Sequence, residues 1–270
     1  MVFSAIARIA LAGALVAGLG AATSLDGGGF SVIAEHMTDA EARDVFERAR
    51  DGHAAVTRYL KLQPTQKIVI TDADTDTANG RTTITMRRGN SEAIAPIQIQ
   101  IPLHYLRKKP FKTAIVHELT HAVAGIPFKG SAILAEGLAV HVNGVFARTD
   151  ESDSFANFPV HEMARRHLRR IVLLNPIQHL YESDGIFTEQ GKTHGSGYSQ
   201  EIGYVFAGSF VTFLVQRDSP EHQDEALARF LRVYRQGDFA KVYGKPLATL
   251  EREWISYINT KPKARFAAGR

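Results

Sequence analysis

Residues 111–125 read Phe-Lys-Thr-Ala-Ile-Val-His-Glu-Leu-Thr-His-Ala-Val-Ala-Gly, and their pattern predicts a helix. The apolar positions recur three and four residues apart, as on one face of a helix: Ile115, Val116, Leu119, Ala122 and Val123. His117 and His121 lie four residues apart, so a helix directs both imidazoles to one side. Glu118 points about 100° around the helix axis from His117. We therefore expect the two histidines to bind one metal ion and Glu118 to reach a water molecule on that ion.

The residue types favour zinc as this metal. Zinc accepts neutral imidazole and carboxylate ligands, and a catalytic zinc keeps one of its four positions for water. Zinc lowers the pKa of the bound water, and Glu118 would accept the proton, which produces a hydroxide-like nucleophile near neutral pH. One Zn²⁺ per chain is the expected cofactor.

A second group of similar residues does not meet the same requirement. His161, Glu162 and His167 lie in another stretch expected to be helical. A separation of six positions places the rings of two histidines about 120° apart on a helix, so the two cannot bind one ion. We expect these three to be surface residues.

The third metal ligand lies downstream of the first helix. The extended metzincin pattern would require Gly at position 124 and His at position 127, where the chain has Ala124 and Pro127. A second helix, expected over residues 132–146, carries Glu136 in its first turns. An antiparallel return of this helix would bring Glu136 towards the histidines. Taken alone, a Glu near a helix start more often compensates the helix dipole, so both roles are open.

Residues 133–142 read Ile-Leu-Ala-Glu-Gly-Leu-Ala-Val-His-Val. This stretch resembles the L-x-E-G-x-A-x-Y segment that follows H-E-x-x-H in gluzincins and related peptidase-MA-like proteins. The resemblance implies that Glu136 is the third zinc ligand, although its interval from His121 is shorter than in thermolysin-like members. Val140 stands where those members place an Asp that supports a zinc-bound histidine, so that support is missing here. His141 stands where Tyr is common, and we expect it to support the site or face solvent.

Residues 204–214 read Tyr-Val-Phe-Ala-Gly-Ser-Phe-Val-Thr-Phe-Leu and are similar to the Y-x-x-A-G-S-F-x-x-[FY]-L helix of such proteins. The stretches 238–239 and 250–257 also resemble their usual C-terminal region. The resemblance implies that Tyr204 donates a hydrogen bond to the oxyanion of the reaction. The alternative is a core aromatic residue with a satisfied hydroxyl. Tyr198 and His194, near the Gly-rich stretch 191–197, are further candidates. The resemblance covers residues 60–260, most closely 113–142.

The order of elements predicts an α+β, zincin-like fold with a small N-terminal sheet and one helix, followed by a mainly helical C-terminal lobe. Thr38 and Glu41 form a capping box before a helix at 40–60. Strands are expected at 67–71, 82–86 and 97–101, and helices at 111–125, 132–146, 160–173, 201–217, 221–234 and 247–258. We expect one domain over residues 30–260 (an α/β lobe to 104, a helical lobe from 105) and a basic tail at 261–270. In zincins the strand before the metal helix lies along the cleft, so residues 97–102 are expected to offer a free edge to extended substrate.

Composition excludes several kinds of site. The 270 residues contain no cysteine, which excludes disulfides, thiolate-bound metals, thiol catalysis and a lipid anchor on cysteine. The net charge of +4 comes from 32 basic and 28 acidic residues that are well mixed along the chain. No run of basic residues is interleaved with aromatic residues, so we expect no nucleic-acid partner.

Residues 1–22 are expected to form a signal peptide or an N-terminal membrane anchor. An uncharged apolar run follows Arg8, and Gly20, Ala21 and Ala22 suit a cleavage site. The run is shorter than the roughly 20 residues that span a bilayer. We expect a periplasmic or secreted protein that contacts a membrane only through this segment, if it is retained.

Together these patterns predict a zinc-dependent peptidase that acts on peptide or protein substrates. His117, His121 and Glu136 would bind zinc, Glu118 would act as general base, and Tyr204 would stabilise the oxyanion. Two alternatives are a zinc hydrolase of non-peptide amides or esters, and a zincin-like binding domain without catalysis. Glu118 argues against the second, because a purely structural zinc site usually has all four positions filled by protein. No pattern predicts an oligomeric state.

Overall fold

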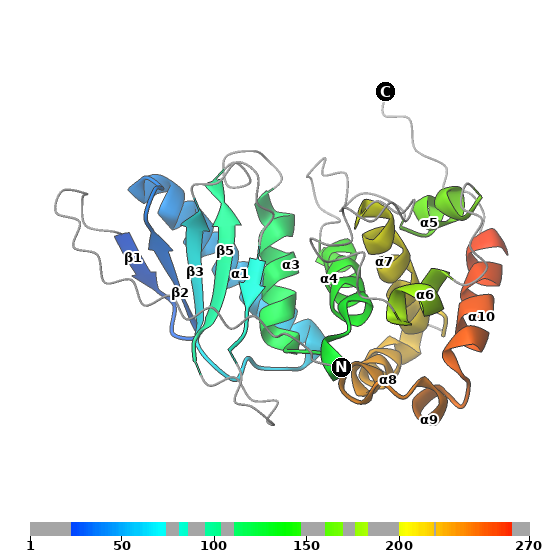
Figure 1. Cartoon of the computed structure of the whole chain (residues 1–270). Helices are drawn as coiled ribbons and strands as arrows, with labels where there is room; N and C mark the ends of the chain where they lie inside the picture. The colour runs from blue at the N-terminus through cyan, green and yellow to red at the C-terminus, as the bar shows by residue number, and fades with distance from the viewer. Residues whose placement is uncertain are drawn as a thin grey trace, which may run out of the picture.

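The computed structural model describes residues 23–73, 81–85, 95–103, 111–146, 160–169, 176–182, 200–218 and 220–260. The expected signal peptide (1–22), the candidates His194 and Tyr198, and the basic tail (261–270) lie outside the described residues. Within them the fold is mixed α+β, as predicted, with a small N-terminal sheet beside a helical body (Figure 1).

The sheet has five strands: β1 (Thr23–Asp26), β2 (Phe30–Ala34), β3 (Ile68–Ala73), β4 (Arg81–Thr83) and β5 (Ile97–Pro102). Their order is β1-β2-β3-β5-β4, with β2, β3 and β5 parallel and β1 and β4 antiparallel to their neighbours. The expectation that residues 97–102 have a free edge is wrong, because β5 lies between β3 and β4. The edge strands among the described residues are β1 and β4, and β4 is the one next to β5.

Two strands of the sheet were not predicted. β1 pairs with β2 through a turn at Gly27–Gly29, where Gly28 has a φ of 80°. A four-residue strand is too short to show a periodic pattern, and the adjoining glycines read as a break in the chain. The sheet therefore extends further towards the N-terminus than residue 30.

Helices α1 (Asp39–Leu60) and α3 (Phe111–Ala124) pack side by side on the sheet. The capping box of α1 is confirmed: the Thr38 hydroxyl accepts from the Glu41 N–H, and the Glu41 carboxylate accepts from the Thr38 N–H. Gly52 of α1 allows α3 to approach, since a Cβ there would lie 3.1 Å from Leu119 Cδ1. In β5 the isoleucines are buried and the two glutamines are exposed, as the alternating pattern predicts.

The helical body comprises α4 (Ala132–Phe146), α5 (Val160–Leu168), α6 (Pro176–Glu182), α7 (Gln200–Gln216), α8 (Gln223–Gln236), α9 (Phe239–Tyr243) and α10 (Leu247–Thr260). Two short 3₁₀ helices, η1 (Phe128–Gly130) and η3 (Pro220–His222), precede α4 and α8. Helices α6 and α9 were not predicted, because seven and five residues are too few for a clear helical period. The start of α6 is instead capped through the tertiary fold, where the buried Glu251 carboxylate accepts from the N–H groups of Ile177 and Gln178.

Helices α4 and α7 cross at the centre of this body through two glycines. A Cβ on Gly137 of α4 would lie 2.8 Å from the carbonyl oxygen of Ala207. A Cβ on Gly208 of α7 would lie 2.2 Å from Val140 Cγ1. Each of the two helices thus has a glycine at the point where its partner helix comes closest. The segments 136–137 and 207–210 therefore have a role in helix packing.

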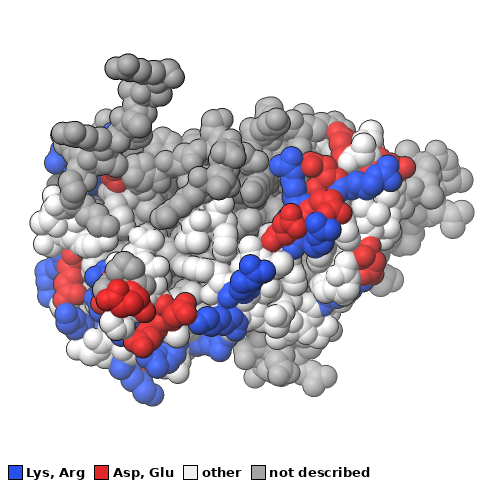
Figure 2. All heavy atoms as spheres, turned by 180° about the vertical axis from the view of Figure 1, so that it is seen from behind, with Lys and Arg blue, Asp and Glu red and all other residues white. Residues whose placement is uncertain are grey.

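The surface carries intermixed charges. On the face seen in Figure 2, basic and acidic side chains of the described residues adjoin one another. Within α1, for example, Arg48 pairs with Asp44 and Arg50 pairs with Glu47. Among the described helices, none is both long and apolar enough to cross a membrane.

Candidate metal centre

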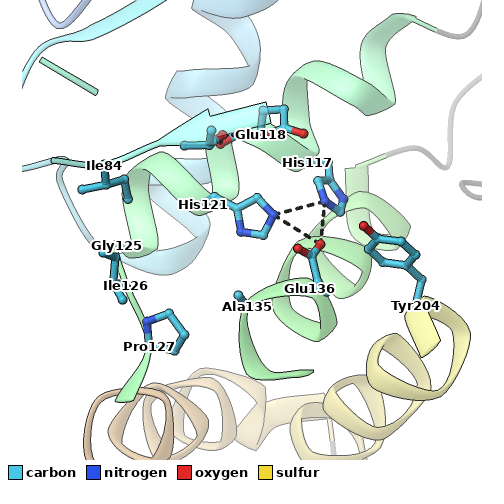
Figure 3. A pocket seen from close by; sticks show the side chains of 11 residues that line it. Ile84, His117, Glu118, His121, Gly125, Ile126, Pro127, Ala135, Glu136 and Tyr204 are labelled. Carbon is cyan, nitrogen blue, oxygen red and sulfur yellow. Dashed lines mark hydrogen bonds and ion pairs between the residues drawn. The ribbon is translucent and has the colours of Figure 1, made fainter. Parts of the chain in front are cut away.

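Helix α3 presents His117 and His121 on one side, as their spacing predicts. Their Nε2 atoms lie 3.1 Å apart, and the two rings meet edge to face with centroids 4.8 Å apart. Both side chains are partly exposed at the floor of a cavity between the sheet side and the helical body. Figure 3 shows both imidazoles directed towards α4.

Glu136 of α4 completes a cluster with these histidines. Its Oε2 lies 3.0 Å from His117 Nε2 and 3.4 Å from His121 Nε2 (Figure 3). The chain reverses between α3 and α4 at Gly125, whose φ of 74° suits glycine and whose N–H donates to the His121 carbonyl. A helix, a short turn and a returning helix thus bring Glu136 to the histidines.

The spacing of the three ligand atoms fits a metal ion. Ligand atoms about 2.0–2.1 Å from a tetrahedral zinc lie about 3.3 Å from one another. The three separations here are 3.0, 3.1 and 3.4 Å. Imidazole nitrogen with carboxylate oxygen suits zinc and several other divalent transition metals. The cluster could therefore hold a metal ion, and the geometry alone does not select zinc.

Charge in the cluster also favours a cation. Burial by itself lowers the pKa of His121, but the charge and hydrogen bond of Glu136 outweigh it and raise this pKa to about 9. Burial by itself raises the pKa of Glu136, and the neighbouring imidazoles outweigh it, so the net pKa is well below its usual range. Glu136 is thus an ionised carboxylate at neutral pH, and positive charge beside it is stabilised.

Glu118 lies beside the cluster and is 6% exposed. Its Oε2 accepts a hydrogen bond of 2.5 Å from the hydroxyl of Thr82 in the edge strand β4. The carboxylate lines the same cavity as the histidines but is not part of the three-residue cluster. The cavity thus contains a second carboxylate besides that of Glu136.

The cavity has a volume of about 310 Å³ and two unlike sides. One side is apolar, with Ile84, Ile126, Pro127 and Ala135. Among the described residues, the large hydrophobic residue that is exposed is Ile126, at 42%. On the other side, Figure 3 shows the Tyr204 hydroxyl directed towards the cluster. The site thus joins a polar centre to an apolar wall.

Tyr204 projects from the first turns of α7. Its ring lies 6.2 Å from that of His117, edge to face, and it is half-buried in the cavity wall. Tyr204 can therefore meet a molecule that enters the cavity.

Two further histidines make contacts that the sequence did not predict. His141 is buried rather than solvent-facing, and its ring nitrogens contact the Tyr59 hydroxyl and the Thr212 hydroxyl instead of a metal ligand. His161 is partly buried, and its Nδ1 lies 2.9 Å from the buried Ser209 Oγ. Both side chains link helices, which their sequence spacing does not reveal.

Glu162 and His167, which the sequence analysis grouped with His161, also make contacts within the fold. Glu162 pairs with Arg165 and Arg166 of the same helix, and its side chain is largely buried. His167 is half-buried, with its ring edge to face against Phe206. All three side chains of this group are thus partly buried, and among the described residues the two rings do not share a metal site, as predicted.

The absence of a carboxylate at Val140 has a packing explanation. Val140 fills the space above Gly208, so a charged side chain there would be placed in the α4–α7 contact. The turn that joins α3 to α4 is held by α8, whose buried Tyr234 donates a 2.6 Å hydrogen bond to the Gly125 carbonyl. Phe128 of the same turn packs against Gly237 at the end of α8. Neither Tyr234 nor Thr82 was singled out from the sequence, because each reaches the site from a distant segment.

Comparison with known proteins finds no protein family whose description matches this sequence and no matching curated protein.

Proposed function

We propose that this chain is a zinc-dependent peptidase of the gluzincin type. The observation that supports it best is the meeting of two imidazoles and one carboxylate at metal-ligand spacing, with a further carboxylate, Glu118, in the same cavity. A site that only stabilised the fold would have no use for Glu118 and an open cavity.

Each side chain has a distinct role in this proposal. A zinc ion held by His117, His121 and Glu136 would polarise the substrate carbonyl and lower the pKa of a water molecule. Glu118 would accept a proton from the attacking water and later deliver it to the leaving amine. Tyr204 donates a hydrogen bond to the carbonyl oxygen as negative charge develops on it.

A peptide substrate is favoured by the edge strand. Among the described strands, β4 is at the margin of the sheet, and its Thr82 borders the cavity. An edge strand can hydrogen-bond to an extended peptide backbone, which would lie across the site. The apolar wall with Ile126 suits an apolar side chain next to the bond that is cleaved. A non-peptide amide or ester is the alternative substrate, and the same zinc chemistry would serve it.

Two variants test the proposal. Glu118→Gln should keep stoichiometric zinc and lose hydrolysis of a mixed peptide library by roughly 10²- to 10⁴-fold, because the base is removed and the ligands remain. Glu136→Ala should lose zinc during dialysis. Glu47→Gln, on the exposed surface of α1, is the matched control and should resemble the wild type in both respects.

Zinc content is measured by atomic absorption and cleavage by mass spectrometry. If Glu136→Ala binds zinc as tightly as the wild type, the ligand assignment is wrong. If the zinc-loaded wild type cleaves no peptide but hydrolyses simple esters or amides, the alternative substrate class takes its place.

A further inference from the structure

The Thr82 side chain of strand β4 contacts Glu118 of helix α3. The Thr82 hydroxyl lies 2.5 Å from Glu118 Oε2 and 3.1 Å from the Glu118 carbonyl oxygen. A hydroxyl has one proton to donate, and the shorter contact to a charged acceptor is the stronger hydrogen bond. The proton of Thr82 is therefore directed to the carboxylate.

The backbone of β4 holds this hydroxyl in place. Thr82 is paired with Ile99 of β5, and its side chain is half-buried and borders the cavity. Thr83, the next residue, is exposed. Successive side chains of a strand point to opposite faces, so only one of these two threonines can reach Glu118.

We propose that Thr82 is a positioning residue for Glu118. Its hydroxyl occupies Oε2 and fixes the plane of the carboxylate, which leaves Oε1 as the oxygen that receives the proton from the attacking water. Among the described residues, Oε1 has no hydrogen-bond partner of its own. The inference rests on the proposed function, because it concerns the residue that acts there as the base.

A purely structural role is the competing explanation. Thr82 could simply attach the short strand β4 to α3, without any effect on the orientation of the base. Such a role would change stability when the hydroxyl is removed, but it would not change the turnover of protein that remains folded and loaded with zinc.

The contact itself is tested in metal-free protein by a double-mutant cycle. Thr82→Val and Glu118→Ala should lower the melting temperature by amounts that do not add in the double variant, because each removes the same hydrogen bond. Thr83→Val combined with Glu118→Ala is the control and should be additive. An additive result for Thr82 overturns the proposal.

The role is tested by kinetics on zinc-loaded protein with a peptide found to be cleaved. Thr82→Val should lower kcat by roughly 10- to 100-fold with little change in KM or zinc content, as when a partner of a functional group is removed. Thr82→Ser keeps the hydroxyl and should restore most of kcat. Thr83→Val should match the wild type.

The outcomes separate the two hypotheses. Wild-type kcat in Thr82→Val, or a Thr82→Ser variant as slow as Thr82→Val, overturns the role of Thr82 while the peptidase function stands. A zinc-loaded wild type that cleaves no peptide overturns the proposed function and the positioning role with it, even if the cycle shows coupling.

Discussion

His141 joins three helices through its two ring nitrogens. Nε2 lies 2.7 Å from the Tyr59 hydroxyl of α1, and Nδ1 lies 3.1 Å from the Thr212 hydroxyl of α7. A neutral imidazole donates from one nitrogen and accepts at the other, so both contacts are satisfied without charge. Burial disfavours the charged ring and lowers the pKa of His141 to about 4.

This histidine should make the fold sensitive to mild acid. The pKa of His141 is about 4 in the folded protein, and 6.5 is the usual value for a histidine in an unfolded chain. Between these two pH values the unfolded chain therefore binds more protons than the folded protein. The stability that the neutral, buried His141 provides is fully present above pH 6.5. As the pH falls towards 4, the free energy of unfolding decreases by about 3 kcal/mol. Denaturant titrations of metal-free protein at pH 4, 5, 6 and 7 measure this loss.

Comparison of variants assigns the effect. His141→Phe should be less stable at pH 7 but should vary less with pH between 4 and 6.5. His179→Ala removes an exposed histidine and should keep the wild-type slope. If His141→Phe keeps the full wild-type slope, the acid sensitivity comes from other groups.

Helices α4 and α7 can cross this closely because two glycines at the crossing have no Cβ atom. Gly137 faces the Ala207 backbone, and Gly208 faces the Val140 side chain. Backbone cannot move aside easily, whereas a valine can change its rotamer at some cost. Because Glu136 adjoins Gly137, the position of the carboxylate depends on how closely these helices approach.

Alanine substitutions should separate crowding from helix propensity. Gly208→Ala should cost about 1–3 kcal/mol of stability through overpacking, and Gly137→Ala should cost more and weaken zinc binding as well. Gly144→Ala, in the same helix α4 with open space around it, should instead gain roughly 0.5–1 kcal/mol. Thermal unfolding and zinc titration measure these effects. Equal costs at all three positions would contradict the role of close approach.

Contacts of α1 and of the turn after α3 connect the sheet and its helices to the helical body. Lys61, at the end of α1, pairs with Asp224 of α8 at 2.7 Å, although both are exposed. Tyr59 meets His141, and Tyr234 holds the turn after α3. The metal ligands themselves come from α3 and α4, which are neighbouring helices (Figure 1). A bound ion would therefore stabilise the whole arrangement.

Addition of Zn²⁺ should raise the melting temperature of protein stripped with a chelator. A ligand that binds only the folded state at 100 times its Kd adds about 2.7 kcal/mol of stability. Mg²⁺ prefers octahedral oxygen ligands, so it should have little effect on a site with two imidazoles. Glu136→Ala should lose most of the response to Zn²⁺. An equal response in this variant would show that zinc binds elsewhere.

Local sequence pattern was sufficient to predict many of the secondary-structure elements of this protein. The α3 helix with its two histidines, the capping box of α1, the alternation of β5 and the extent of α4 follow from periods of two or 3.6 residues and from short spacings. The meeting of Glu136 with the histidines was also within reach, because only a short turn separates their helices. Short elements such as β1, α6 and α9 carry too few residues for such a signal.

Only the tertiary structure decided which strand borders the cavity and which distant side chains meet there. The strand order places β4, not β5, at the edge, and so brings Thr82 to Glu118. The α4–α7 crossing explains Val140, and the junction of three helices buries His141. These contacts join segments far apart in the chain. Strand order and helix crossing arise from how whole elements pack, and periodicity within one element carries no information about them.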